Sequence, residues 1–183
     1  MTQGHVEGIL KLFSADTAAR NIMGSIPHRK DILAVLINTK KLNTGELDLS
    51  RPRTRLGQVM TNTKGEVIAY MGISIAQKAK PTNHEHWYVW GVQCPETISG
   101  LFIRMMITAK KERSKGYGSI LFSEAKRLAN TLGLHIYCDT HESNLGMRSF
   151  LQNEGGVVER FWCTKKETKM VRYCVPQILH PAP

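Results

Sequence analysis

The stretch from residue 101 to residue 132 constrains the fold most, because its pattern changes from strand to helix across a short glycine turn. An apolar run over 101–107, interrupted at Arg104, has the length of a buried strand. The basic turn Arg113-Ser114-Lys115-Gly116-Tyr117-Gly118 follows it. Apolar residues then recur at helical spacing, at Leu121, Ala125, Leu128 and Leu132. This order predicts a mixed α/β domain in which the turn leads directly into the N-terminus of a helix.

The turn has the chemistry of a phosphate site. The first amides of a helix have no intrahelical partner, and the positive end of the helix dipole lies beside them. Gly116 and Gly118 carry no side chain that would hold a ligand away from the backbone. Four cations surround the same point, at Lys110, Lys111, Arg113 and Lys115. These features predict a site for a phosphorylated cofactor, in particular a diphosphate.

The same turn fits the pattern Arg/Gln-x-x-Gly-x-Gly/Ala of the GNAT N-acetyltransferase superfamily, which the chain resembles over roughly residues 100–162. A second strand at 134–138 and a short helix opened by Asn144 follow in the family's order. Met147, Phe150 and Gly155 then fall where the family has a small or apolar residue, an aromatic or leucine, and a glycine. The resemblance implies a GNAT fold, which is one mixed, largely antiparallel sheet flanked by helices on both faces.

The resemblance also implies the cofactor and its contacts. In this family the glycine turn wraps the pyrophosphate of acetyl-coenzyme A, and a splayed central strand supplies backbone groups to the pantetheine arm. Residues of the second short helix contact or pack beside that arm. Carried over residue by residue, the cofactor-binding positions are Ile107, Thr108, Ala109, Arg113, Ser114, Lys115, Gly116, Tyr117, Gly118, Ser119, Asn144 and Phe150. The activity implied is transfer of an acetyl group from acetyl-coenzyme A to an amine of a small molecule or peptide.

Two positions depart from the family pattern. The family often has a tyrosine directly after the aromatic of the second helix, where it can protonate the leaving thiolate, and this chain has Leu151. Where the family usually has Gly-Phe, the chain has Gly155-Gly156. The first departure leaves the catalytic acid unassigned, and the second is expected to alter only packing.

A catalytic base is not assigned either. A base is needed because the attacking amine must be neutral. The candidates are ordinary polar residues near the opened strands and in an aromatic insertion, namely Asp139, His141, Glu142, His84, Glu85 and His86. Asp139 and Glu142 have an alternative role as caps of the helix near Asn144. The aromatic insertion itself, residues 84–90, is read either as an ordinary buried strand or as a set of aromatics that line an acceptor pocket or stack on a planar substrate.

The formal net charge of +10 leaves a further function class open. Besides the glycine turn, two basic clusters stand out, one at Lys165, Lys166, Lys169 and Arg172 and one at Arg51, Arg53 and Arg55. Each is read either as solvated surface charge or as an attractor of nucleic acid or an acidic substrate. The alternatives to the transferase are therefore a GNAT-like nucleic-acid-binding or nucleic-acid-modifying protein, and a coenzyme A-binding fold without transfer.

The remaining expectations concern metals, redox state and location. The four cysteines, at 94, 138, 163 and 174, are widely spaced, so we expect reduced and mostly buried thiols and no metal site. The sequence has no apolar run long enough to span a bilayer, and its first residues lack the pattern of a signal peptide. The expected location is the cytoplasm, and the expected state is a monomer or homodimer.

Periodicity and turn signals divide the chain into one GNAT-like domain over residues 1–175 and a proline-rich tail over 176–183. Helices are expected at 6–24 and 29–41, a loop at 43–52, and a polar connection at 77–83. The further strands are expected at 56–62, 66–75, 86–92, 157–163 and 170–175.

Overall fold

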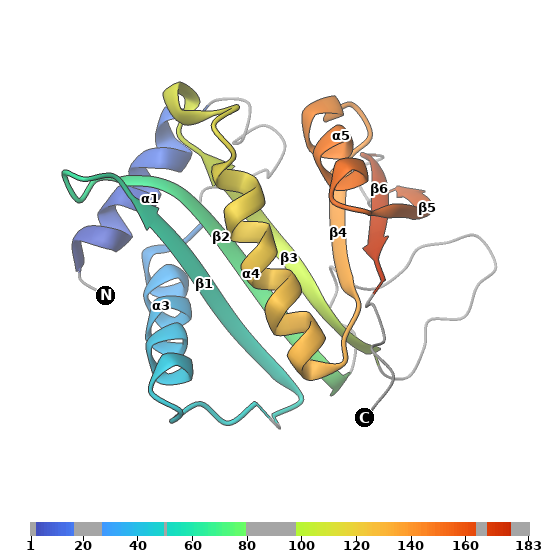
Figure 1. Ribbon diagram of the computed structural model, residues 1–183, viewed down its shortest axis with the longest axis horizontal. Coiled ribbons are helices and arrows are strands. Elements are labelled where there is room, and N and C mark those ends of the chain that lie inside the picture. The colour runs from blue at the N-terminus through green and yellow to red at the C-terminus, as the bar shows by residue number, and fades with distance from the viewer. Residues whose placement is uncertain (1–2, 17–26, 50, 80–97, 164–167, 177–183) are drawn as a thin grey trace.

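The protein is described from a computed structural model, which places residues 3–16, 27–49, 51–79, 98–163 and 168–176. Within these residues six strands form one sheet in the order β1-β2-β3-β4-β6-β5, with helices on both faces (Figure 1). In chain order the elements are α1 (Gln3–Ala15), α3 (Arg29–Asn43), β1 (Arg53–Thr61), β2 (Val67–Ala79), β3 (Ile98–Thr108), the 3-10 helix η1 (Lys110–Glu112), α4 (Tyr117–Leu132), β4 (Ile136–His141), α5 (Leu145–Asn153), β5 (Val157–Cys163) and β6 (Lys169–Val175).

The sheet is mixed and largely antiparallel. Strands β1, β2 and β3 pair antiparallel to one another, as do β4, β6 and β5. The parallel pair β3 and β4 joins these two halves, and α4 makes the crossover between them. The fold class expected from the sequence is therefore confirmed.

Alternating side chains of the central strands build two cores. Met71 and Ile73 of β2 belong to the larger core, which includes the buried face of α4. Tyr70, which precedes Met71 in the chain, belongs to the core that includes α1 and α3. Because neighbouring side chains of a strand point to opposite faces, these helices cover opposite sides of the sheet. Figure 1 shows α4 lying across β1–β3 on one side.

A polar anchor fixes α3 on the edge strand β1. The hydroxyl of Thr39 accepts a hydrogen bond from the Gly57 amide at 2.8 Å and lies 2.9 Å from the Gly57 carbonyl oxygen. The approach is close, since a Cβ atom on Gly57 would lie 2.5 Å from Cγ1 of Val35. Glycine at this position therefore lets the helix cover the outer strand.

Most expected elements are present, with changed ends. Helix α1 begins at Gln3 rather than at residue 6 and ends at Ala15, while the rest of that expected helix, from residue 17, lies outside the described residues. Helix α3 is confirmed and continues to Asn43. Strand β1 begins at Arg53, and β6 begins at Lys169. The expected strand at 86–92, the aromatic stretch at 84–90 and the tail beyond residue 176 lie outside the described residues.

The expected polar connection over 77–83 is wrong in its first part, because β2 continues through Ala79. Ala76 pairs with Gly100 and Ala79 pairs with Ile98, across an irregularity in the register. Pairing with β3 thus overrides the polar sequence Gln77-Lys78, which has little strand character by itself. No helix in the described part of the chain is both long and apolar enough to cross a bilayer.

Candidate functional site

The sheet opens where β3 and β4 separate. Their pairing covers only Leu101 with Ile136, Phe102 with Tyr137, and Ile103 with Cys138. Beyond these pairs β3 stays with β2, while β4 stays with β6. The β4-facing backbone groups over residues 104–108 therefore have no partner on β4, and Figure 1 shows the two strands diverging toward the end of the molecule that carries the 113–118 turn.

A bulge in β3 lies at the point of separation. The register with β2 shifts between Ile73–Ile103 and Gly72–Met105, so Arg104 is an extra residue on β3. A bulge bends its strand and increases the local twist. The only charged residue in the apolar run thus lies where the strand turns away from β4, and its side chain is exposed.

The glycine turn adopts the backbone that a phosphate site requires. Gly116 has φ +81° and is the N-cap of α4, with no side-chain cap on the helix. The helical hydrogen bonds begin with Ile120 N–H donating to Gly116 O at 3.1 Å, so the amides of residues 117–119 precede them. Ser114 also has a left-handed conformation, with φ +62°, which is uncommon outside glycine and costs free energy. The turn directs three amides of a helix N-terminus outward beside the opened strand.

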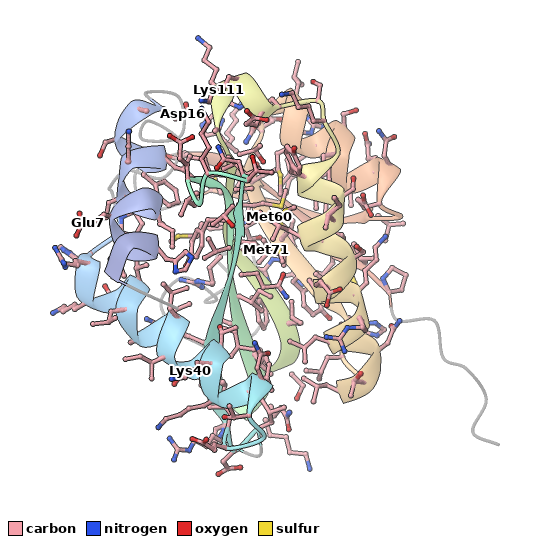
Figure 2. All side chains as sticks on the ribbon, turned by 60° about the vertical axis from the view of Figure 1, so that its left-hand side comes forward. Glu7, Asp16, Lys40, Met60, Met71 and Lys111 are labelled. Atoms are coloured by element: carbon pink, nitrogen blue, oxygen red, sulfur yellow. The ribbon has the colours of Figure 1, made fainter. Side chains whose placement is uncertain are left out.

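Two of the four predicted cations already have carboxylate partners. Arg113 forms an ion pair with Asp16, which follows α1, and its Nε donates to the Thr108 carbonyl at 3.3 Å. Lys115 pairs with Glu112 at 2.9 Å, and this contact raises the pKa of the ammonium. Arg113 thereby ties the turn to the end of β3. Lys110 and Lys111 of η1 are exposed, and Figure 2 shows Lys111 and Asp16 at the same end of the molecule.

Helix α5 contacts the start of α4 beside the opening. A Cβ atom on Gly118 would lie 3.5 Å from the Phe150 ring and 3.7 Å from the end of Met106. The first turn of α4, the splayed part of β3 and α5 therefore meet at Gly118. Phe150 also packs edge-on against Phe122, with ring centroids 5.5 Å apart. The structure thus brings the predicted residues Gly118 and Phe150 together with Met106 of β3.

Asn144 opens α5, as the sequence predicted, and its side chain caps the helix. Its Oδ1 accepts from the Met147 amide at 3.2 Å, and its Nδ2 donates to the Thr140 hydroxyl at 3.1 Å. Asn144 is the N-cap of α5, so the alternative in which Asp139 or Glu142 caps this helix is wrong. A contact between Asn144 and the cofactor remains a prediction.

Asp139 is held by a buried arginine. Nε and Nη2 of Arg172 each donate to its carboxylate at 2.6 Å, and Nε1 of Trp162 donates at 3.3 Å. The Arg172 side chain is completely enclosed, with the residue 1% exposed. Arg172 therefore does not belong to a basic surface cluster, which corrects the sequence interpretation.

The remaining base candidates are less constrained. The Nδ1 atom of His141 accepts from the Ser143 amide at 3.1 Å and lies 2.6 Å from the Ser143 hydroxyl. A neutral His141 therefore carries its proton on Nε2. The carbonyl of Glu142 accepts from Arg148 at 3.0 Å. His84, Glu85 and His86 lie outside the described residues.

The structure accounts for both departures from the family pattern. Leu151 is 0% exposed and belongs to the core beneath α4 and α5. A Cβ atom on Gly156 would lie 2.7 Å from the Leu151 carbonyl oxygen, to which the Gly156 amide donates at 2.8 Å. Glycine is needed there because the chain turns back closely against the end of α5.

The thiols divide by exposure. Cys138 is buried beneath the opening, and burial raises its pKa far above the ordinary range of a thiol. Cys174 is half-buried and Cys163 is exposed, so among the three described cysteines the expectation of mostly buried thiols is only partly correct. Cys94 lies outside the described residues. Among the described residues no cluster of histidine, cysteine or carboxylate side chains could hold a metal ion.

Three residues of the site were not predicted from the sequence. Asp16 and Glu112 neutralise two of the cations, and Met106 lies against Gly118. The ion pair of Asp16 with Arg113 joins residues 97 positions apart, and no local pattern signals it. The bulge had a visible signal, since Arg104 interrupts an otherwise apolar strand.

The sequence model of the acetyltransferase (GNAT) family matches residues 35–155. The protein therefore belongs to the GNAT acetyltransferase family. A search of curated proteins found no sequence match. The solved structures that the fold resembles include acetyltransferases at low identity.

Chaetomium thermophilum Naa20, solved with a bisubstrate analogue, has a TM-score of 0.65 and 13% identity, covering 96% of this chain and 84% of that one. The ribosomal-protein-S18-alanine N-acetyltransferase of Escherichia coli has a TM-score of 0.62 and 9% identity, covering 98% and 92%. A Bacillus anthracis protein assigned as a streptothricin acetyltransferase, solved with acetyl coenzyme A, has a TM-score of 0.51 and 15% identity. That match covers 70% of this chain and 65% of that one. At these identities the likeness shows the fold alone.

Proposed function

We propose that the protein transfers the acetyl group of acetyl-coenzyme A to an amine of a small molecule or peptide. The observation that carries the proposal is the separation of β3 from β4 directly beside the unprotected N-terminus of α4. Family membership supports acetyltransferase chemistry. That the acceptor is an amine is part of this proposal.

The residues at the opening fit coenzyme A. The amides of residues 117–119 and the two glycines of the turn would hold the diphosphate. The strand edge over 104–108 would offer N–H and C=O groups to the amides of the pantetheine arm, with Phe150 packed beside it. Lys110 and Lys111 would add positive charge where the ligand carries its phosphates.

The chain's own part in the chemistry is chiefly to position two substrates. Backbone N–H groups at a strand edge can polarise the thioester carbonyl. An amine held next to that carbonyl can attack it without a separate diffusional encounter, which speeds the reaction. The amine nitrogen would form a bond to the carbonyl carbon, the carbon–sulfur bond would break, and the amine would lose one proton. Because Leu151 is apolar and buried, the thiolate would receive its proton from water or from another group.

An acetylation screen tests this proposal. Purified protein with acetyl-coenzyme A is offered polyamines, aminoglycosides, free amino acids and peptides, including a peptide that begins with alanine, and thiol release is measured. Acceptor-dependent thiol release with a matching mass increase of the acceptor supports the proposal. Coenzyme A binding without transfer to any acceptor would favour the alternative of a binding fold. Salt-dependent binding of DNA or RNA without coenzyme A binding would favour the nucleic-acid alternative.

A further inference from the structure

A pocket lies between α3 and the beginning of the edge strand β1. Its volume is about 380 Å³, which falls within the roughly 300–1,000 Å³ typical of small-molecule sites. Three arginines line it, Arg51, Arg53 and Arg55, against one carboxylate, that of Asp31. The structure thus gathers one of the basic clusters of the sequence around a single pocket with an excess of positive charge.

The register of β1 directs two of these arginines toward α3. Arg53 and Arg55 are two residues apart in the strand, so their side chains leave the same face of the sheet. Gly57 lies on this face as well, and a Cβ atom there would lie 2.5 Å from Val35 of α3. Both guanidinium groups therefore leave the sheet on the side that α3 covers, where the pocket lies.

The edge of β1 adds a backbone donor. In an antiparallel strand the N–H and C=O groups of one residue point to the same side, because hydrogen-bonded pairs exchange both bonds. The Arg55 carbonyl accepts from Nδ2 of Asn38 at 3.0 Å, so it points to the outer edge and not to β2. The Arg55 amide points to the same edge. Sheet-edge amides beside guanidinium groups form a set of donors that suits an oxyanion.

We propose that this pocket binds the phosphate or diphosphate group of a small ligand. The guanidinium fork matches the oxygen geometry of phosphate and keeps its charge at any physiological pH. Arg51 has only an exposed pair with Asp48, at 3.6 Å, which contributes little and leaves the guanidinium able to bind a ligand. Arg55 forms no ion pair within the described part of the chain. A multivalent anion would therefore gain two guanidinium partners at little cost.

The cover that α3 gives to the strand favours a small ligand over an added peptide strand. Thr39 already bonds the amide and carbonyl of Gly57, and Asn38 bonds the carbonyl of Arg55. A peptide that extended the sheet would need these same edge groups. The pocket beside them offers donors over a short length only, which fits a single phosphate or diphosphate group.

The pocket is separate from the glycine turn. Arg53 pairs with Ala76, which pairs with Gly100 near the beginning of β3, whereas the turn follows Thr108 at the other end of that strand. With a rise of about 3.3 Å per residue, these two ends lie roughly 25 Å apart. Figure 1 shows η1 and the beginning of β1 at opposite ends of the sheet. The inference therefore concerns a second ligand and does not rest on the proposed activity.

The test is titration of the ¹⁵N-labelled full chain with inorganic diphosphate at physiological salt. We expect saturable amide shifts over residues 51–55 with a Kd below about 1 mM. Shifts at 116–119 are read in the same spectra, so a failure of the proposed cofactor site and a failure of this pocket are distinguishable. Citrate, which carries a similar charge on carboxylates, should bind at 51–55 at least about tenfold more weakly.

Two double variants locate the binding. Arg51→Gln with Arg55→Gln should weaken the binding at 51–55 by about tenfold or more and leave the shifts at 116–119 unchanged. Lys40→Gln with Lys41→Gln removes the same number of charges from exposed residues of α3 that do not line the pocket, and should change the affinity by less than about twofold. The amide spectra also show whether each variant is folded, and Arg55→Gln alone replaces the first pair if it is not.

Three results would overturn the proposal. The first is the absence of saturable shifts over 51–55 at about 10 mM diphosphate, and the second is equal weakening by the arginine and lysine variants. The third is tighter binding of another class of anion at the same amides. Citrate binding as tightly as diphosphate would mean a carboxylate ligand, and a short oligonucleotide binding more tightly, with a steep salt dependence, would mean nucleic acid.

Discussion

At the scale of single residues, Gly116 has the strictest requirement in the site. Its φ of +81° suits glycine, although a Cβ atom there would meet nothing within 4 Å. A side chain would therefore fit beside the turn but would stand where a phosphate must approach the helix amides. A substitution at Gly116 can therefore block phosphate binding in a protein that still folds.

Gly116→Val is expected to lower coenzyme A affinity at least about tenfold, a change of roughly 1.4 kcal/mol. The left-handed backbone should also lower the free energy of unfolding, by about 1–2 kcal/mol. Gly45→Val is a matched control, because Gly45 has φ +73°, is equally open and lies at the end of α3. Titration calorimetry should show lost affinity only for the change at 116, and equal affinity in both folded variants would mean that the diphosphate binds elsewhere.

Asp139→Ala should lower the free energy of unfolding by about 3–5 kcal/mol, because it removes the carboxylate from a buried guanidinium. The double variant Asp139→Leu with Arg172→Met removes both charges and should recover much of this loss. Chemical denaturation measures both effects. A loss below about 1 kcal/mol for Asp139→Ala would show that the ion pair does not stabilise β4 and β6.

The cysteines should differ sharply in reactivity toward iodoacetamide. The raised pKa of Cys138 keeps its thiol protonated at about pH 8, and burial excludes the reagent. Cys163 is exposed and should be alkylated before the other two described cysteines, with Cys174 slower because burial also raises its pKa. Peptide mass spectrometry of the native protein follows each site. Early labelling of Cys138 would mean that the core beneath the opening is accessible in solution.

At the scale of elements, two contacts brace α5 against α4. Lys126 pairs with Glu154 at 2.7 Å, and Phe122 packs against Phe150. The Phe150 ring also lies near the start of α4, 3.5 Å from where a Cβ atom on Gly118 would be. The brace was not predictable, because the sequence pattern shows each helix but not which of their faces meet.

Lys126→Ala should lower the free energy of unfolding by about 1–2 kcal/mol, because the largely buried Glu154 loses its partner. Arg127→Ala is the matched control one residue along the same helix. Its pair with Glu124 is well exposed and should contribute at most about 0.5 kcal/mol. Thermal unfolding compares the stability of the two variants. Equal losses of stability would show that the Lys126–Glu154 pair does not brace α5 against α4.

The sequence predicted elements best where local signals agreed. The α4 start follows from the glycine turn, and the short helix α5 follows from Asn144, which the structure confirms as its N-cap. Predictions failed where strand pairing decided the outcome, as at the C-terminal end of β2, where polar residues join the sheet. The burial of Arg172 failed for a related reason, since only the register of β4 and β6 reveals that Asp139 faces it.

At the scale of the whole molecule, the site is made by the sheet splitting into two antiparallel halves. The turn, the strand edge and α5 come from one continuous stretch of the chain, from β3 to α5, which is why sequence motifs could predict them. The ion pair of Asp16 with Arg113 depends on long-range packing and could not be predicted. The divergence of β3 from β4 was expected from the family resemblance and not from the strand pattern itself. The single-domain organisation over residues 1–175 remains a prediction.

Titrating ¹⁵N-labelled protein with coenzyme A tests the central claim most directly. If the diphosphate binds the N-terminus of α4 and the pantetheine arm follows the opened strand, the largest amide shifts should occur at residues 116–119 and along 104–109. Amides of α3, on the opposite face of the sheet, should change little. Saturable binding with shifts confined to other elements, or no binding at millimolar coenzyme A, would contradict the account.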